Sequence, residues 1–376
     1  MDRIEWHAFA AADLNSVELR AAWDQLNDAG PNLPILDSDA VCIALDCFGT
    51  GRERLLVGKR GGATLAMGLF EQSSRFAWRS FQPSQMPLGC WIAAADGSVQ
   101  DLARSLARSG ALPACLTLSL TQLDSLFSPV GDDTATERRS PYIETAWIDV
   151  AGSFEDYWAQ RGKNLRQNMK KQRNKLQTEG ITVGMRTLTD ATEMGAAVLR
   201  YGQLEAGGWK ARQGTAIEAG NVQGTFYSQL LSTAAARSQA RVYEYYFGDA
   251  LVASNLCLLR DRCLLILKTT YDESITGFSP AFLLHQDMLQ ALFERGEVRR
   301  IEYYGRVMEW HTRWTSQQRP LFHLTSFRYG WLKALALWRS RRAAAAAAAA
   351  AVAATAAVAA TAAPPAESVV AERAAD

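Results

Sequence analysis

The chain has 376 residues, 48% hydrophobic and 21% charged, which is typical of a globular protein with room for two domains of ordinary size. Its 40 basic and 39 acidic residues nearly cancel, so the net charge does not indicate a nucleic-acid or membrane partner. The six cysteines contain no CxxC pair and the four histidines are scattered. These patterns argue against a metal site and favour a cytoplasmic protein with reduced cysteines.

Both ends of the chain lack membrane signals. The first residues, MDRIEWHAFAAADLN, carry acids and no apolar run, so they do not read as a signal peptide. Residues 343–363 are nearly all alanine, which is only weakly apolar. We therefore expect no membrane span, and predict a low-complexity tail at 341–376 that is disordered or partly helical.

A first domain is predicted at residues 1–140. Its expected elements are a helix at 17–26, a hairpin of strands 54–60 and 63–71 around Gly61-Gly62, a helix at 98–109 and an apolar strand-like run at 114–120. The polar stretch 129–141 is bounded by proline and glycine, which favours an interdomain link.

A second domain is predicted at residues 141–340. It begins with a strand at 144–150, a helix at 153–179, a strand at 181–188 and helices at 190–206 and 224–237. Three strands with tight turns follow at 241–247, 251–259 and 263–272, and such turns require antiparallel pairing. Ser279 and Pro280 then open a helix that Gly296 ends, and a last strand is expected at 300–305.

The stretch 161–175 holds seven cations and no acid. We interpret it as the solvated face of a helix whose buried side carries Leu165, Met169 and Leu176. The alternative is a surface for phosphate or nucleic acid.

The order of three strands, a helix and a strand suggests a chemistry. A helix that joins neighbouring strands begins at the strands' carboxyl edge, where its unpaired N–H groups and its dipole favour phosphate. A coenzyme A pyrophosphate fits the N–H groups of Ala281, Phe282 and Leu283, beside Ser279, with the pantetheine arm between strands 263–272 and 300–305. A backbone N–H near Tyr271 then faces the developing oxyanion.

Three segments carry a family resemblance: EAGGWKARQGTAI (205–217), KTTYDESITGFSPAFLL (268–284) and EYYG…W…W (302–314). They resemble the CelD-like acetyltransferases, a GNAT family associated with cellulose and polysaccharide biosynthesis and related to the FemAB-type transferases. The resemblance covers about 145–330 well and the first half in outline. It departs from the family at Ala281, where glycine is usual, and at His311, where lysine is usual.

This resemblance implies an α+β (mixed α/β) fold of two tandem GNAT-like domains, each a mostly antiparallel sheet flanked by helices, with a degenerate first domain. It also implies acetyl-CoA or another acyl-CoA as donor, no metal, and an amine or carbohydrate-linked acceptor. Two alternatives stay open: an aminoacyl-tRNA-dependent transferase acting on a cell-wall precursor, and a non-catalytic scaffold. Nucleic acid is expected only in the first of these.

Candidate site residues follow from the segments. Asp272 is a general base or a turn-initiating residue, and Tyr271 is an acid for the leaving thiolate. His311 is a base or a packed side chain. We expect Lys268, at the end of its strand, to take part in binding the donor, and expect four further residues to contact the acceptor: Trp209, Lys210, Arg212 and Trp314.

Overall fold

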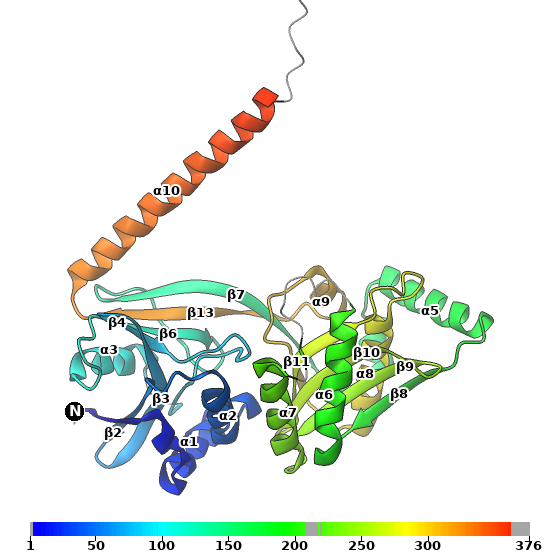
Figure 1. The fold of residues 1–376 in the computed structure, drawn as a ribbon, viewed down its shortest axis with the longest axis horizontal. Helices are drawn as coiled ribbons and strands as arrows, with labels where there is room; N and C mark the ends of the chain where they lie inside the picture. The colour runs from blue at the N-terminus through cyan, green and yellow to red at the C-terminus, as the bar shows by residue number, and fades with distance from the viewer. Residues whose placement is uncertain (1–2, 96, 208–216, 219, 362–376) are drawn as a thin grey trace, which may run out of the picture. The chain divides into compact units, whose positions relative to one another are not determined.

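Two successive sets of elements with the same order build residues 3–328 (Figure 1). The computed structural model describes residues 3–95, 97–207, 217–218 and 220–361. The described residues up to Arg328 form one compact unit, and those from Tyr329 to Thr361 belong to a second unit. Within the first unit we call residues 3–136 the first half and residues 150–317 the second half.

Apart from the short strand β5 (Trp91–Ala93), the first half is built in the order strand, two helices, three strands, helix, strand. Its elements are β1 (Glu5–Ala10), α1 (Val17–Ala29), α2 (Ser38–Phe48), β2 (Arg54–Arg60), β3 (Ala63–Ser74), β4 (Ala77–Ser80), β5 (Trp91–Ala93), α3 (Val99–Ser109) and β6 (Thr117–Asp124). The predicted hairpin is confirmed, since Gly61 and Gly62 join β2 and β3 with φ of 55° and 85°. β4 and β6 pair in parallel across α3.

The second half repeats this order after two helices, α4 (Phe154–Ala159) and α5 (Lys163–Thr178). Its elements are β8 (Val183–Leu188), α6 (Ala191–Ala206), α7 (Val222–Ala235), β9 (Ala240–Phe247), β10 (Ala250–Arg260), β11 (Cys263–Tyr271), α8 (Pro280–Arg295), β12 (Arg300–Glu302) and α9 (Glu309–Trp314). β9, β10 and β11 form the predicted antiparallel meander, and β12 pairs in parallel with β11. Gly296 ends α8 in the left-handed conformation, with φ of 62°.

Two long strands join the halves into one sheet. They are β7 (Glu137–Asp149), which leaves the first half, and β13 (Gln318–Phe327), which returns from the second. β13 pairs with both β6 and β7, and β7 continues to β12. The described strands, apart from β5, therefore follow the order β1-β2-β3-β4-β6-β13-β7-β12-β11-β10-β9-β8.

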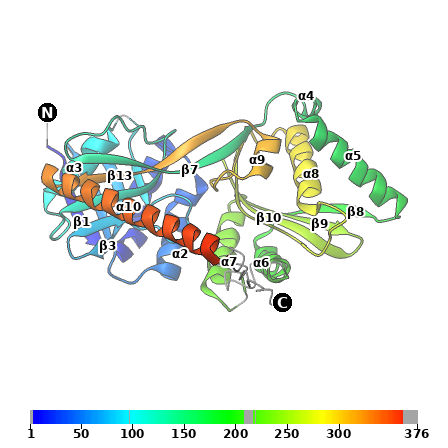
Figure 2. The ribbon, with the colours of Figure 1, turned by 90° about the horizontal axis from the view of Figure 1, so that it is seen from above.

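Helices cover the second half's sheet on both faces (Figure 2). α4, α5 and α8 lie on one face, over a core that includes Leu165, Met169 and Leu284. α6 and α7 lie on the other face, and their core continues into α1 and α2 of the first half. Phe48 of α2, for example, lies 5.2 Å from Phe226 of α7, ring centre to ring centre. The two halves thus share a hydrophobic core.

The structure departs from the sequence predictions at several boundaries. The expected link at 129–141 becomes strand from Glu137 onward, because β13 supplies a pairing partner far along the chain. The single helix expected at 153–179 is two helices, and Gly162 is the residue before α5. The last strand ends at Glu302 rather than at 305. The basic stretch is helical as expected, with Leu165, Met169 and Leu176 buried.

The second unit contains α10 (Gly330–Thr361), which includes most of the alanine-rich run. Within the described ranges, no helix combines the length and apolar character that crossing a bilayer requires.

A buried charged network lies where the strands of the two halves meet. Arg319 of β13 donates to both carboxylate oxygens of Asp124, at 2.8 and 2.6 Å, and lies 3.0 Å from Glu302 Oε2. The Tyr304 hydroxyl donates to Asp124 Oδ2 at 2.7 Å. Burial raises the pKa of Glu302 to about 7, although Arg319 opposes the rise.

This raised pKa predicts a pH-dependent stability. In the unfolded chain Glu302 ionises near its ordinary pKa of 4.5, whereas the folded protein resists its ionisation up to about pH 7. The free energy of unfolding should therefore lose a contribution as the pH rises from about 4.5 to about 7. Urea unfolding at several pH values should show this loss in the wild type, and Glu302→Gln should remove it. An unchanged pH slope in the variant would contradict the prediction.

Candidate active site

The candidate site begins where β11 and β12 separate. Their parallel ladder has three pairs, from Cys263 with Arg300 to Leu265 with Glu302. After β12 the backbone turns at Tyr304, which has a φ of 47°. No strand in the described part of the chain pairs with this edge of β11 beyond Leu265. Backbone groups on that edge are therefore available to a ligand.

The start of α8 is held by α5. The Ser279 N–H donates to Gln172 Oε1 at 2.9 Å, and Gln172 Nε2 donates to Ser279 Oγ at 3.1 Å. The N–H groups of Phe282 and Leu283 both donate to the Ser279 carbonyl, at 3.0 and 3.1 Å. The N–H of Ala281 has no acceptor among the described residues. Three backbone N–H groups were predicted to bind phosphate, and the one that remains available is that of Ala281.

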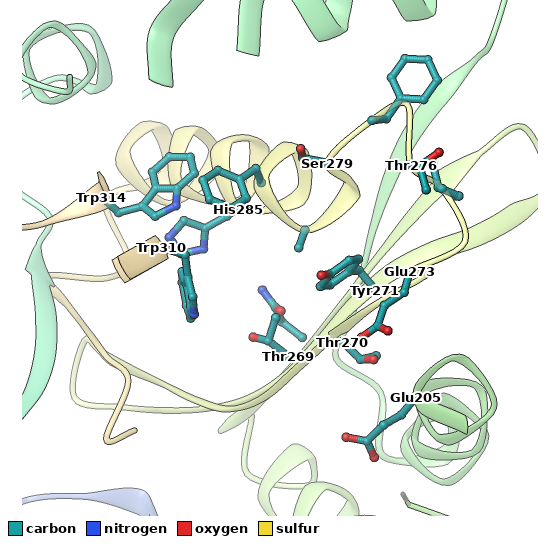
Figure 3. Close-up of a pocket in the computed structure, with 15 residues that line it drawn as sticks. Glu205, Thr269, Thr270, Tyr271, Glu273, Thr276, Ser279, His285, Trp310 and Trp314 are labelled. Atoms are coloured by element: carbon teal, nitrogen blue, oxygen red, sulfur yellow. The ribbon is translucent and has the colours of Figure 1, made fainter. Parts of the chain in front are cut away.

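A cavity of about 640 Å³ extends from this helix start to the end of β11, and we call it the α8 cavity. Figure 3 shows His285, Trp310 and Trp314 on one side of it and Thr270, Tyr271 and Glu273 on the other. Ser279, Ala281 and Phe282 line its α8 end. The structure therefore brings together several predicted site residues from α8, β11 and α9.

Glu205 is a cavity residue that the sequence analysis missed. It lies at the end of α6, is 2% exposed, and lines the α8 cavity (Figure 3). Its Oε2 accepts the Ile217 N–H at 2.9 Å, and its Oε1 lies 3.9 Å from Lys268 Nζ. A buried carboxylate beside a lysine and a cavity is a group suited to proton transfer. The sequence feature that could have identified Glu205 is its position as the first residue of the EAGGWK segment, which carries the family resemblance.

Two of the predicted catalytic residues, Tyr271 and Asp272, are adjacent in the chain but have different surroundings. Tyr271 lines the α8 cavity and is 42% exposed. Asp272 follows it and forms a local turn, because its Oδ1 accepts the Ser274 N–H at 2.9 Å and the Ser274 hydroxyl at 2.6 Å. This geometry matches the turn-initiating alternative for Asp272.

His311 lies beside the cavity in α9. Its Nδ1 accepts the Met308 N–H at 2.9 Å, and its ring stacks on Trp310 with centres 3.6 Å apart. Burial lowers the pKa of His311 to about 4. The geometry resembles a packed helix cap, and its role as a base stays a prediction.

His285 and Tyr303 form a further pair that the sequence did not single out. Tyr303 Oη lies 2.8 Å from His285 Nε2, and both side chains are buried. Burial lowers the pKa of His285 to about 3, so this ring is neutral at pH 7. A neutral imidazole in hydrogen-bond contact with a tyrosine orients the wall of the cavity without adding charge.

A second cavity, of about 510 Å³, is lined by an earlier part of β11, and we call it the interhalf cavity. The second half contributes Leu265–Lys268 and Tyr303–Arg306, and the first half contributes the segment from Gln82 to Pro87. Lys268 lines this cavity while the next residue, Thr269, lines the α8 cavity. The two cavities therefore adjoin along β11, close to Glu205. Three predicted acceptor contacts, Trp209, Lys210 and Arg212, lie outside the described residues.

Comparisons with known proteins agree with this fold. Residues 163–312 match the family model of the acetyltransferase (GNAT) domain. The C-terminal domain of an Agrobacterium fabrum protein assigned as a lysylphosphatidylglycerol synthetase is 12% identical, with 85% of this chain and 95% of that chain covered and a TM-score of 0.52. FemX is 8% identical, with 82% and 96% covered and a TM-score of 0.53. No curated protein matches the chain.

These findings confirm the predicted fold class, a mixed α/β fold with a GNAT-like sheet flanked by helices. The matched GNAT region contains β9 to β12, α8 and the residues that line the α8 cavity, except Trp314. Among the described residues, no group of three or more His, Cys, Asp and Glu is arranged to hold a metal. The fold and the matched region are those of a GNAT acyltransferase-like domain.

Proposed function

We propose that the protein transfers an acyl group from acyl-CoA to an amine or hydroxyl of a carbohydrate or cell-envelope precursor. The observation that carries this proposal is the unpaired edge of β11, along which the two cavities adjoin. The acyl-CoA arm lies in the α8 cavity and hydrogen-bonds that edge. Its phosphates lie near the Ala281 N–H, where the α8 dipole favours negative charge.

The transfer follows from this placement. The acceptor nitrogen or oxygen attacks the thioester carbonyl, and a backbone N–H of β11 stabilises the oxyanion. Glu205 takes the proton that the acceptor loses. The carbon–sulfur bond then breaks, and the sulfur leaves as a thiolate that Tyr271 protonates. Lys268 Nζ lies 3.9 Å from Glu205 Oε1, so this ion pair holds the carboxylate beside the cavity.

The test is calorimetry with acetyl-CoA, together with an assay of thioester hydrolysis. We expect micromolar binding and slow release of free thiol. Absence of binding to acetyl-CoA would overturn the proposed donor.

One observation favours a second donor, aminoacyl-tRNA. The exposed face of α5 carries several cations, and α5 holds the start of α8 through Gln172. The exposed cations are Lys163, Arg166, Lys170, Lys171 and Lys175. Binding of charged tRNA that weakens steeply with salt, combined with no binding of acetyl-CoA, would favour this donor.

The contact between α5 and α8 gives a specific prediction. Gln172→Ala removes both hydrogen bonds to Ser279, so the helix start loses its fixed position. We expect the KM for acyl-CoA to rise by about fivefold with kcat nearly unchanged, since about 1 kcal/mol of net hydrogen bonding is lost. Steady-state kinetics measure both constants. Gln177→Ala, an exposed change on the same helix, is the control, and equal effects of the two variants would contradict the prediction.

A further inference from the structure

The charged side chains in the described lining of the interhalf cavity are all basic. Its described lining includes two cations, Lys268 and Arg306, and no aspartate or glutamate. The α8 cavity, by contrast, is lined by Glu205 and Glu273. Arg306 is exposed at the cavity and forms no ion pair with any described residue. A guanidinium in this position is suited to bind phosphate or carboxylate through two parallel hydrogen bonds.

The remaining lining is polar but uncharged, or aromatic. The first half supplies amide and hydroxyl groups, which donate and accept hydrogen bonds: Gln82, Ser84, Gln85 and Gln122. Tyrosines add rings from β7 and from the second half: Tyr142, Tyr227, Tyr303 and Tyr304. Such a wall fits a ligand with several hydroxyl groups and an apolar ring face, with an anion at one end.

We propose that the interhalf cavity binds the acyl acceptor and selects one that carries a phosphate or carboxylate. Arg306 binds the anion, and the acceptor's amine or hydroxyl lies at the Lys268 end, next to Glu205. This inference rests on the proposed acyl transfer and adds the chemical class of the acceptor. Both halves of the chain contribute to the selection, because the amide-bearing wall belongs to the first half.

The test compares three amine probes that share a sugar ring: glucosamine, glucosamine 6-phosphate and 2-amino-2-deoxyglucuronic acid. We expect at least one anionic probe to bind about tenfold more tightly than glucosamine, the effect of one charge-assisted contact. Arg306→Gln should reduce this preference to about twofold or less. Which anion is preferred separates a phosphorylated acceptor from a carboxylated one.

Two controls keep the inference separate from the proposed function. Arg299→Gln changes another exposed arginine, outside the cavity lining, and should leave the preference intact. Acetyl-CoA binding, measured on the same samples, should be the same in all three proteins. Equal or absent binding of the three probes while acetyl-CoA still binds would overturn the acceptor class alone. Absent binding of acetyl-CoA would overturn the proposed function instead.

Discussion

Glu205→Gln is expected to lower kcat by about 100- to 1000-fold, the contribution of a positioned general base. The amide keeps the volume of the side chain and an oxygen that can accept the Ile217 N–H. It cannot take a proton from the acceptor, so the chemical step loses its base. Acetyl-CoA binding should change little, because the proposed phosphate contact lies at the α8 end of the cavity. Single-turnover kinetics and calorimetry measure the two effects separately.

Matched variants make this assignment testable. Glu273→Gln removes the other carboxylate that lines the α8 cavity, and we expect less than about a threefold effect because Glu273 is exposed. Asp272→Asn and His311→Ala test the bases predicted from the sequence. If either lowers kcat more than Glu205→Gln, the base is that residue and our assignment is wrong.

Arg319→Met is expected to lower the free energy of unfolding by about 3–5 kcal/mol. The methionine approximates the arginine's length, but Asp124 and Glu302 lose their shared cation while they stay buried. An uncompensated buried carboxylate is costly, whereas an exposed ion pair contributes little. Urea unfolding at neutral pH measures the loss.

Arg300→Met is the control for this prediction. Arg300 lies on β12 near the same Glu302, at 3.9 Å, and its side chain is 35% exposed. We expect a loss of less than about 1 kcal/mol, because a partly exposed guanidinium at this distance contributes little. Similar losses in the two variants would show that burial of the network does not determine its contribution.

Local patterns in the sequence determined much of the second half. Three strand-like segments joined by tight turns predicted β9, β10 and β11, and these strands form the expected meander. Pro280 and Gly296 predicted the two ends of α8, and the structure places both ends there. Leu165, Met169 and Leu176 predicted the buried side of α5. In each case the signal lies within a few residues of the feature, because capping, turns and helical periodicity depend on near neighbours.

The tertiary structure alone decided how distant segments meet. Glu137–Pro141 is polar and looks like a link, but it becomes strand because β13, nearly 200 residues later, pairs with it. Three contacts of the candidate site and the charged network also join segments that are far apart in the sequence. They are Gln172 with Ser279, Glu205 with Lys268, and Arg319 with Asp124. No local periodicity encodes such a contact, since it forms only when sheet order and helix packing bring the segments together. The sequence by itself therefore determined the GNAT-like elements, and the packing of the two halves decided which side chains form the candidate site.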